Sequence, residues 1–172
     1  IRKKKRFFCA SCAFSWLFLF VRMLKIRKII SGGQTGADRA AFDFALEKGI
    51  EIGGFVPKSR MAEDGEISAK YPNLLETRAK NPAKRTELNV KYSDATLILS
   101  HGNLTGGSKK TLQLAEKHQK PFLHIDFYEI SFDEAVLKTK EWLGQIDCQG
   151  LNIAGARGSK NAKIYEKTKE FF

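Results

Sequence analysis

The segment Ser31–Arg39 (SGGQTGADR) combines the residue types that hold a phosphate group. Glycines let the backbone turn tightly and present bare N–H groups to an anion, and the start of a helix adds a favourable dipole. The spacing differs from G-x-G-x-x-G and from the lysine-bearing P-loop, and the next strand-like run ends in Phe55 and Val56 rather than an acid, which argues against an ordinary NAD site. Thr35 and Asp38 have the spacing of a capping box, so a capped helix after a tight turn is the structural alternative.

Two further loops repeat this design. In the first, Thr105–Ser108 (TGGS) is followed one turn later by Thr111, so that glycines precede hydroxyls at a predicted helix start. In the second, Asn152–Ser159 (NIAGARGS) contributes Arg157, whose guanidinium suits a phosphate or a carboxylate. Helix capping and a surface arginine are the structural alternatives. Three such loops after different strands indicate one pocket for a ligand with two anionic or polar ends.

Other polar residues have less specific patterns. Residues 58–81 are polar and interrupted by glycine and proline, and we expect a long irregular loop. This loop forms either a lid, with the charged residues Lys58, Arg60, Glu63 and Asp64, or a solvated surface. Arg85 and Asn89 lie four residues apart and so share one helix face. The sequence has neither metal-ligand spacing nor a nucleophile elbow, so no protein-ligated metal is expected.

Hydrophobic periodicity supplies the elements that must position these loops. Short β-branched runs alternate with helical patterns, which predicts an α/β fold, three-layered and Rossmann-like, with a mostly parallel sheet of about five strands flanked by helices. Ligands of such sheets bind at the carboxyl ends of the strands, where the glycine loops gather. The expected strands are 25–31, 50–56, 95–100, 121–125 and 150–154, and the expected helices are 35–48, 82–92, 109–118, one that begins at the capping box Ser131-x-x-Glu134, and 161–172.

Charge divides the 172 residues into two parts. Residues 1–22 carry six basic residues, no acid and the apolar run 7–21, and we interpret them as an upstream leader outside the functional protein, with a signal or anchor as the alternative. The single domain expected at 23–172 has 24 basic against 19 acidic residues, which gives little support for nucleic-acid binding except through the leader. Cys9 and Cys12 lie in the leader and only Cys148 in the body, which is typical of a reducing cytoplasm. A membrane partner is not expected.

The chain resembles the family of molybdenum cofactor carrier proteins, part of a Rossmann-like superfamily that also contains the cytokinin-activating phosphoribohydrolases. The similarity runs in order from about Lys25 to Tyr165. It is carried by the blocks SGGQTGADRAAFDFA, GGFVPKSRMAEDG, YPNLLET, RTELNV, SDATLI, TGGSKKT, LHID and LNIAGARGS.

The resemblance implies a ligand and residues that hold it. The ligand would be a phosphorylated pterin, molybdenum cofactor, whose metal is held by its own dithiolene. The implied phosphate cradle is Gly32, Gly33, Gln34, Thr35 and Gly36, with Asp38 beside it, and a β-branched substitution at Gly33 is expected to abolish binding while leaving the fold. The remaining implied contacts are Thr105, Gly106, Gly107, Ser108, Thr111, Arg60, Arg85, Asn89, Asp126, Asn152 and Arg157.

One departure separates the chain from the related enzymes. The phosphoribohydrolases have a motif similar to P-G-G-x-G-T-x-x-E. In this chain the corresponding segment Thr105–Thr111 lacks the proline, and Gln113 stands where the glutamate carboxylate would act. We therefore favour a non-catalytic carrier of a phosphorylated pterin or a related nucleotide-like ligand. The alternative is a protein that processes or senses a nucleotide or an ADP-ribose-like molecule, by N-glycosidase-like chemistry that uses Asp38 or Glu63. A homodimer or tetramer is expected in either case.

Overall fold

The computed structural model describes residues 26–78 and 82–172. The expectations for the leader, residues 1–22 with Cys9 and Cys12, lie outside the described residues. Among the residues that are described, no helix is both long enough and apolar enough to cross a membrane.

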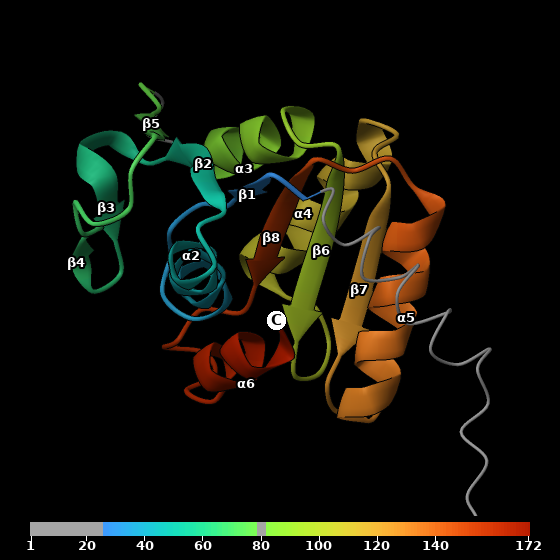
Figure 1. Ribbon diagram of the computed structural model, residues 1–172. Coiled ribbons are helices and arrows are strands. Elements are labelled where there is room, and N and C mark those ends of the chain that lie inside the picture. The colour runs from blue at the N-terminus through green and yellow to red at the C-terminus, as the bar shows by residue number, and fades with distance from the viewer. Residues whose placement is uncertain (1–25, 79–81) are drawn as a thin grey trace, which may run out of the picture.

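The centre of the domain is a six-stranded parallel sheet (Figure 1). Its spatial order is β5 (Leu74–Glu76), β2 (Glu51–Val56), β1 (Lys28–Ile30), β8 (Gly150–Gly155), β6 (Ala95–Ser100) and β7 (Phe122–Asp126). All six residues of β6 are buried, as expected for a strand covered on both faces. The last strand of the chain, β8, thus lies between β1 and β6, so the three glycine loops that follow these strands emerge side by side.

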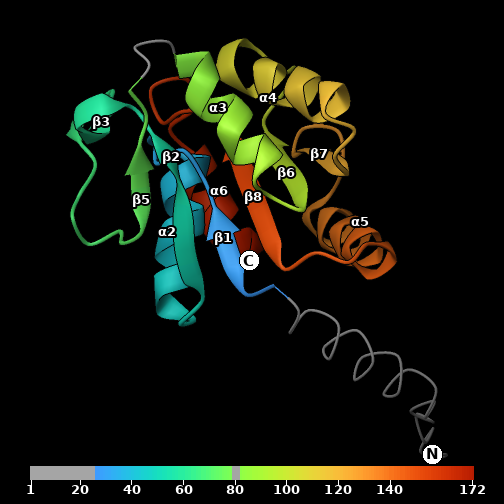
Figure 2. The same cartoon turned by 90° about the horizontal axis from the view of Figure 1, so that it is seen from above.

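Helices cover both faces, which gives the three layers seen from above in Figure 2. Helices α2 (Ala37–Glu47), α5 (Phe132–Gln145) and α6 (Ile164–Phe171) pack on one face over the main apolar core. Helices α3 (Pro82–Lys91) and α4 (Gly106–Lys117) pack against each other on the other face, over a smaller apolar cluster. The three-layer Rossmann-like fold predicted from the sequence is therefore confirmed.

The segment 58–81 differs from the irregular loop that was predicted. It contains the short helix η1 (Lys58–Arg60), the hairpin of β3 (Met61–Ala62) and β4 (Gly65–Glu66), and the edge strand β5, which is the sixth strand of the sheet. Strands of two or three residues are too short to give a recognisable alternation of polar and apolar residues. They form because neighbouring backbone groups, such as those of Gly54–Val56 beside β5, supply hydrogen-bond partners.

Two helix starts also differ from those predicted from the sequence, and one predicted cap is present. Helix α4 begins at Gly106 rather than Lys109, so the second glycine loop forms the first turn of the helix instead of preceding it. The predicted Thr35–Asp38 capping box is wrong, because α2 starts after Gly36 and has no side-chain cap. The Ser131–Glu134 capping box is confirmed, with both reciprocal hydrogen bonds present.

A partly buried carboxylate connects α2 to two other parts of the chain. Asp43 accepts hydrogen bonds from Lys70 Nζ at 2.8 Å, Tyr71 Oη at 3.0 Å and Tyr165 Oη at 2.6 Å. Burial alone would raise the pKa of Asp43, but these three donors together outweigh burial and lower its pKa below the usual 3.8. Asp43 thereby holds the segment before β5 and helix α6 against α2.

We expect Asp43→Asn to destabilise the fold by about 1–3 kcal/mol at neutral pH, because the ionised acceptor of three hydrogen bonds is lost. Since the pKa of Asp43 is lowered on folding, its contribution is present above pH 3.8 and is lost as the pH falls through the lowered value. Urea unfolding of both proteins at several pH values measures this difference. Glu51→Gln, which removes the exposed Lys28–Glu51 pair, is the control and should cost about 0.5 kcal/mol or less.

Candidate functional site

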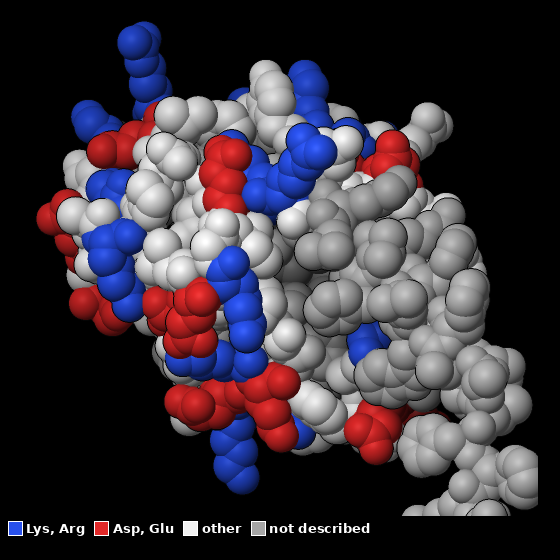
Figure 3. Space-filling model, in the orientation of Figure 1, with Lys and Arg blue, Asp and Glu red and all other residues white. Residues whose placement is uncertain are grey.

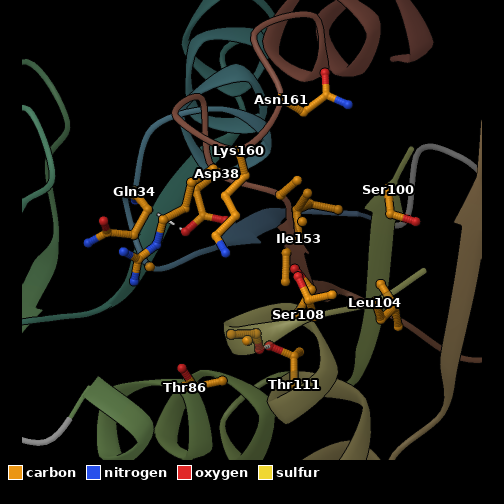
Figure 4. Close-up of a pocket in the computed structure, with 18 of the residues that line it drawn as sticks. Gln34, Asp38, Thr86, Ser100, Leu104, Ser108, Thr111, Ile153, Lys160 and Asn161 are labelled. Atoms are coloured by element: carbon orange, nitrogen blue, oxygen red, sulfur yellow. Dashed lines mark hydrogen bonds between the residues drawn. The ribbon is translucent and has the colours of Figure 1, made fainter. Parts of the chain in front are cut away.

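A cavity of about 380 Å³ opens at the carboxyl ends of the central strands. Figure 4 shows Asp38 and Lys160 on one wall, Thr86, Ser108 and Thr111 on the facing wall, and Ile153 of β8 between them. The volume lies in the range of sites for small molecules. Its position is the one expected for ligands of parallel α/β sheets.

The cavity brings together most, but not all, of the site residues predicted from the sequence. Those that line it come from all three glycine loops and from α3: Gly32, Gln34, Asp38, Arg85, Asn89, Thr105, Gly106, Gly107, Ser108, Thr111, Asn152 and Arg157. Five predicted residues do not line it: Gly33, Thr35, Gly36, Arg60 and Asp126.

The first glycine loop faces the cavity mainly through Gly32. A Cβ at this position would lie 1.4 Å from Nη1 of Arg85 and 3.1 Å from Oδ2 of Asp38, so the bare glycine backbone makes room for both charged groups. Gly33 faces the opposite way. It has a φ of +69°, and a Cβ there would lie 2.9 Å from Cδ1 of Ile67.

The placement of Gly33 corrects the expectation attached to it. A valine at Gly33 would press on the packed side chain of Ile67 and would strain a left-handed backbone, while its side chain would not enter the cavity. Such a variant therefore tests the fold and not the binding of a phosphate.

The N-terminus of α2 is covered by the third glycine loop. The Ala37 amide donates to the carbonyl of Ala156 at 3.3 Å, and a Cβ on Gly36 would lie 2.4 Å from that same oxygen. Gly36, with a φ of +81°, is thus needed for the two loops to pack closely. The Ala37 amide is used within the protein, and Gly33, Thr35 and Gly36 of the suggested cradle do not line the cavity.

The N-terminus of α4 is arranged differently. Thr105 is its N-cap but makes no side-chain cap hydrogen bond, and Gly106, Gly107 and Ser108 line the cavity. The Thr111 hydroxyl donates to the Gly107 carbonyl at 3.0 Å within the helix. Because the first amides of a helix have no partner within the helix itself, this end of α4 presents N–H donors and the positive end of a dipole to the cavity.

A buried ion pair lies on the side of the cavity next to Gly32. Asp38 is 7% exposed and Arg85 is 9% exposed, and Nη1 of Arg85 lies 3.9 Å from Oδ2 of Asp38, beyond hydrogen-bond distance. Oδ2 of Asp38 accepts a hydrogen bond from the backbone amide of Gln34 at 3.2 Å. Burial raises the pKa of Asp38, although Arg85 and the Gln34 amide oppose the rise, and burial lowers the pKa of Arg85. Within the described residues, Nε of Arg85 is buried without a hydrogen-bond partner.

The two predicted asparagines are engaged in structural hydrogen bonds. Asn89 accepts from the Phe55 amide at 2.6 Å and donates to the Phe55 carbonyl at 3.1 Å, which ties α3 to β2. Asn152 donates to Thr96 Oγ1 at 3.2 Å between adjacent strands. Both residues line the cavity, but these bonds fix how their side chains are oriented.

The charged residues of segment 58–66 tie the loops together outside the cavity. Glu63 accepts hydrogen bonds from the Thr35 hydroxyl and from Ser159 (N at 3.1 Å, Oγ at 2.6 Å), and Arg157 lies 3.9 Å from it. Arg39 binds Asp64 with both terminal nitrogens. Thr35 and Glu63 therefore join the first loop, the β3–β4 hairpin and the third loop.

Two more of the predicted contacts stabilise loops. The Arg60 guanidinium donates to the carbonyls of Ile67, Ser68 and Tyr71 at 2.9–3.1 Å, which closes the segment after the hairpin. Asp126 accepts the Gly102 amide at 2.7 Å and the Tyr128 amide at 3.0 Å. Neither residue lines the cavity.

Several lining residues were missed by the sequence reasoning. Lys160 and Asn161 follow the third loop, His101 and Asn103 precede α4, and Thr86 is next to Arg85 on α3. Lys160 had a signal that could have found it, because it lies three residues after Arg157 in a predicted phosphate loop. His101 and Thr86 had no such signal, since their orientation depends on how the helices pack.

The cavity is cationic, whereas the visible surface is mixed. Among the described residues, its charged lining consists of Arg85, Arg157 and Lys160 and one carboxylate, that of Asp38. On the face shown in Figure 3, basic and acidic side chains lie interspersed. Among the described residues, no three His, Cys, Asp or Glu side chains are grouped so as to hold a metal ion. The arrangement is suited to an anion bound by N–H donors.

Three comparisons relate the chain to known proteins. Residues 29–172 match the model of the circularly permutated YpsA SLOG family. A solved structure from Syntrophus aciditrophicus, named "putative molybdenum carrier protein", is 50% identical, with a TM-score of 0.83 over 86% of this chain and 92% of that chain. A second, (E)-4-hydroxy-3-methyl-but-2-enyl diphosphate reductase, is 15% identical with a TM-score of 0.35 over 95% of this chain and 65% of that one, too distant to support an argument. No curated protein matches the chain significantly.

Alanine substitutions at two loop glycines should separate loop packing from the cavity surface. Gly36→Ala is expected to lower the free energy of unfolding by about 2 kcal/mol or more, because the methyl group meets the Ala156 carbonyl and the backbone is left-handed. Gly107→Ala is the control: a Cβ there meets nothing within 4 Å, and alanine favours the helix by about 0.5–1 kcal/mol. Denaturant unfolding measures both variants, and equal stability of the two would contradict the packing role of Gly36.

Proposed function

The chain belongs to the circularly permutated YpsA SLOG family, and we propose that it is a carrier that binds a phosphorylated pterin such as molybdenum cofactor, or a related nucleotide-like ligand. The observation that carries the proposal is the N-terminus of α4, which has no side-chain cap and lines a cavity that also contains three cationic side chains. N–H donors and a helix dipole at such an end stabilise a phosphate.

The phosphate would bind at Gly106, Gly107 and Ser108, with the ammonium of Lys160 and the guanidinium of Arg157 on the facing wall. In Figure 4 the Lys160 side chain extends from its loop into the cavity, toward the wall that carries Ser108. Arg157 also lies 3.9 Å from Glu63, so part of its charge is already balanced. This position differs from the one the sequence suggested, since the helix start after Gly36 is covered by Ala156.

The chemistry of the cavity is compatible with molybdenum cofactor. The 50%-identical relative is named a putative molybdenum carrier protein. The pterin of that cofactor bears a phosphate and holds molybdenum through its own dithiolene, so the protein would supply hydrogen-bond donors and cations rather than metal ligands. Arg85, Arg157 and Lys160 are groups of this kind, and all three line the cavity.

A nucleotide-processing enzyme is the second candidate, and one residue favours it. Asp38 is a buried carboxylate with a raised pKa in the cavity, which are properties of many general acids and bases. Gln113 and Glu116 on α4 are exposed and do not line the cavity, so that helix contributes no carboxylate. Release of free base from AMP or GMP by the purified protein, lost in Asp38→Asn, would establish the enzyme.

The direct test is native mass spectrometry of freshly purified protein, followed by identification of any small molecule that co-purifies. A pterin phosphate bound at one per chain is the expected result. A co-purified adenine nucleotide would overturn the proposal of a pterin carrier and would support a carrier of a nucleotide-like ligand. Hydrolysis products of that nucleotide would instead indicate the nucleotide-processing enzyme.

We expect Lys160→Ala to weaken binding of ribose 5-phosphate about tenfold, because one charge-assisted hydrogen bond is worth roughly 1.5–3 kcal/mol, less where water reaches it. Isothermal titration calorimetry at low salt measures the affinity. Lys110→Ala, which removes an exposed lysine of α4 outside the cavity, is the matched control and should change it less than twofold. Equal effects of the two substitutions would show a general charge effect and would reject the phosphate position.

A further inference from the structure

We propose that Asp38 and Arg85 together recognise the edge of a 2-amino-pyrimidin-4-one ring, the group that pterins and guanine share. This inference rests on the proposed function, because it assumes that the phosphate of the same ligand binds at α4. It adds what the phosphate site does not provide, namely selection of one heterocycle over others.

The first argument comes from charge. Asp38 is the one carboxylate that lines the cavity within the described residues, and it is 7% exposed. A phosphate beside it would be repelled and would lose solvation at the same time. The anionic end of the ligand therefore belongs at the α4 end of the cavity, and the part of the ligand next to Asp38 must donate hydrogen bonds.

The second argument comes from the unused hydrogen-bonding capacity of the pair. The 3.9 Å between Nη1 of Arg85 and Oδ2 of Asp38 exceeds the 2.7–3.2 Å of an N–H···O bond, and Nε of Arg85 has no partner within the described part of the chain. An ionised carboxylate has about four lone-pair positions. On Asp38, the backbone amide of Gln34 occupies one of these positions.

The third argument comes from shape. Gly32 has no side chain, and any Cβ there would overlap the Arg85 guanidinium and approach Asp38. The Arg85 guanidinium therefore packs over the Gly32 backbone with Asp38 beside it, and all three residues line the same part of the cavity. A planar group that approaches this side meets two acceptor oxygens next to a row of donors.

These positions match one heterocyclic edge well. In a 2-amino-pyrimidin-4-one, a ring N–H and an amino group point the same way and can donate to the two oxygens of Asp38, while the neighbouring carbonyl oxygen accepts from Arg85. Hypoxanthine lacks the amino group and so loses one of these bonds. Adenine presents a ring nitrogen lone pair instead of the N–H, which would face the carboxylate and be repelled. When the wrong ring binds, some buried polar groups of the site lose their hydrogen-bond partners. Such a site therefore discriminates strongly between heterocycles.

Titration of the wild-type protein with GMP, IMP, AMP and ribose 5-phosphate tests the proposal. GMP is expected to bind at least about tenfold more tightly than IMP, and IMP more tightly than AMP. A comparison of neopterin monophosphate with GMP then distinguishes the two sources of the same edge: tighter binding of the former identifies a pterin site, and tighter binding of GMP a guanine site. Similar affinities for GMP, IMP and AMP would overturn the proposal.

The variant Asp38→Asn should reduce the ratio of GMP to IMP affinity to about one, because an NH2 donor replaces the carboxylate oxygen that would accept from the amino group. Binding of ribose 5-phosphate should become about twofold tighter or more, because a negative charge has left a cationic cavity. Asp43→Asn is the matched control, since it makes the same substitution outside the cavity and should preserve the wild-type ratio. A wild-type ratio in Asp38→Asn would reject the role of Asp38.

These measurements separate this inference from the function on which it rests. If ribose 5-phosphate binds but the nucleotides are not discriminated, the phosphate site stands and the heterocycle assignment fails. If neither ribose 5-phosphate nor any nucleotide binds the wild-type protein, the proposed function itself fails. Should Asp38→Asn not fold, the wild-type order of GMP, IMP and AMP still decides the question.

Discussion

The insertion of β8 between β1 and β6 is the constraint on which the rest of the site depends. A parallel sheet places the carboxyl ends of neighbouring strands at one edge, and this order makes neighbours of three loops that lie far apart in the chain. The close packing is local: the Ala37 amide donates to Ala156, and the Ala156 amide donates to Leu99. The loop after β8 is thus held by backbone contacts with the start of α2 and with β6, and the cavity forms where the loops of β1 and β8 face the start of α4.

Burial of the Asp38–Arg85 pair is the main energetic cost of this arrangement. Transferring two charges out of water costs several kcal/mol per ion, and a pair 3.9 Å apart with an unpartnered Nε recovers only part of that cost. Contacts elsewhere must compensate. The apolar core under α2, α5 and α6 and the hydrogen bonds to Asp43 supply stability that does not involve the cavity. The scaffold is therefore stabilised mainly on one face of the sheet, and its polar, costly groups gather at one edge.

The sequence predicted the layers and most of the cavity, and the reasons for its errors are physical. Hydrophobic periodicity located five strands and five helices because each buries a continuous face. It did not find β5, which has three residues, or the hairpin of β3 and β4. Composition indicated which loops contain glycine, but glycine serves two purposes here. Gly32 leaves space for charged groups at the cavity, whereas Gly33 and Gly36 allow left-handed turns and close backbone contact. Tertiary packing distinguishes these roles: Gly33 lies against Ile67, and Gly36 lies against Ala156, about 120 positions away in the chain.

The position of Asp38 also bears on whether the site can catalyse a reaction. A general base for attack on a glycosidic bond must reach a water molecule near the ribose, between the heterocycle and the phosphate. Asp38 instead lies next to Gly32 and Arg85, on the wall opposite the Ser108 and Thr111 of α4. If the phosphate binds at α4 and the ring edge at Asp38, the ribose or its equivalent lies between them, beside β8, where the lining residues Ile153, Ala154 and Gly155 carry no titratable group. That placement would hold a ligand at both ends, with its middle next to β8.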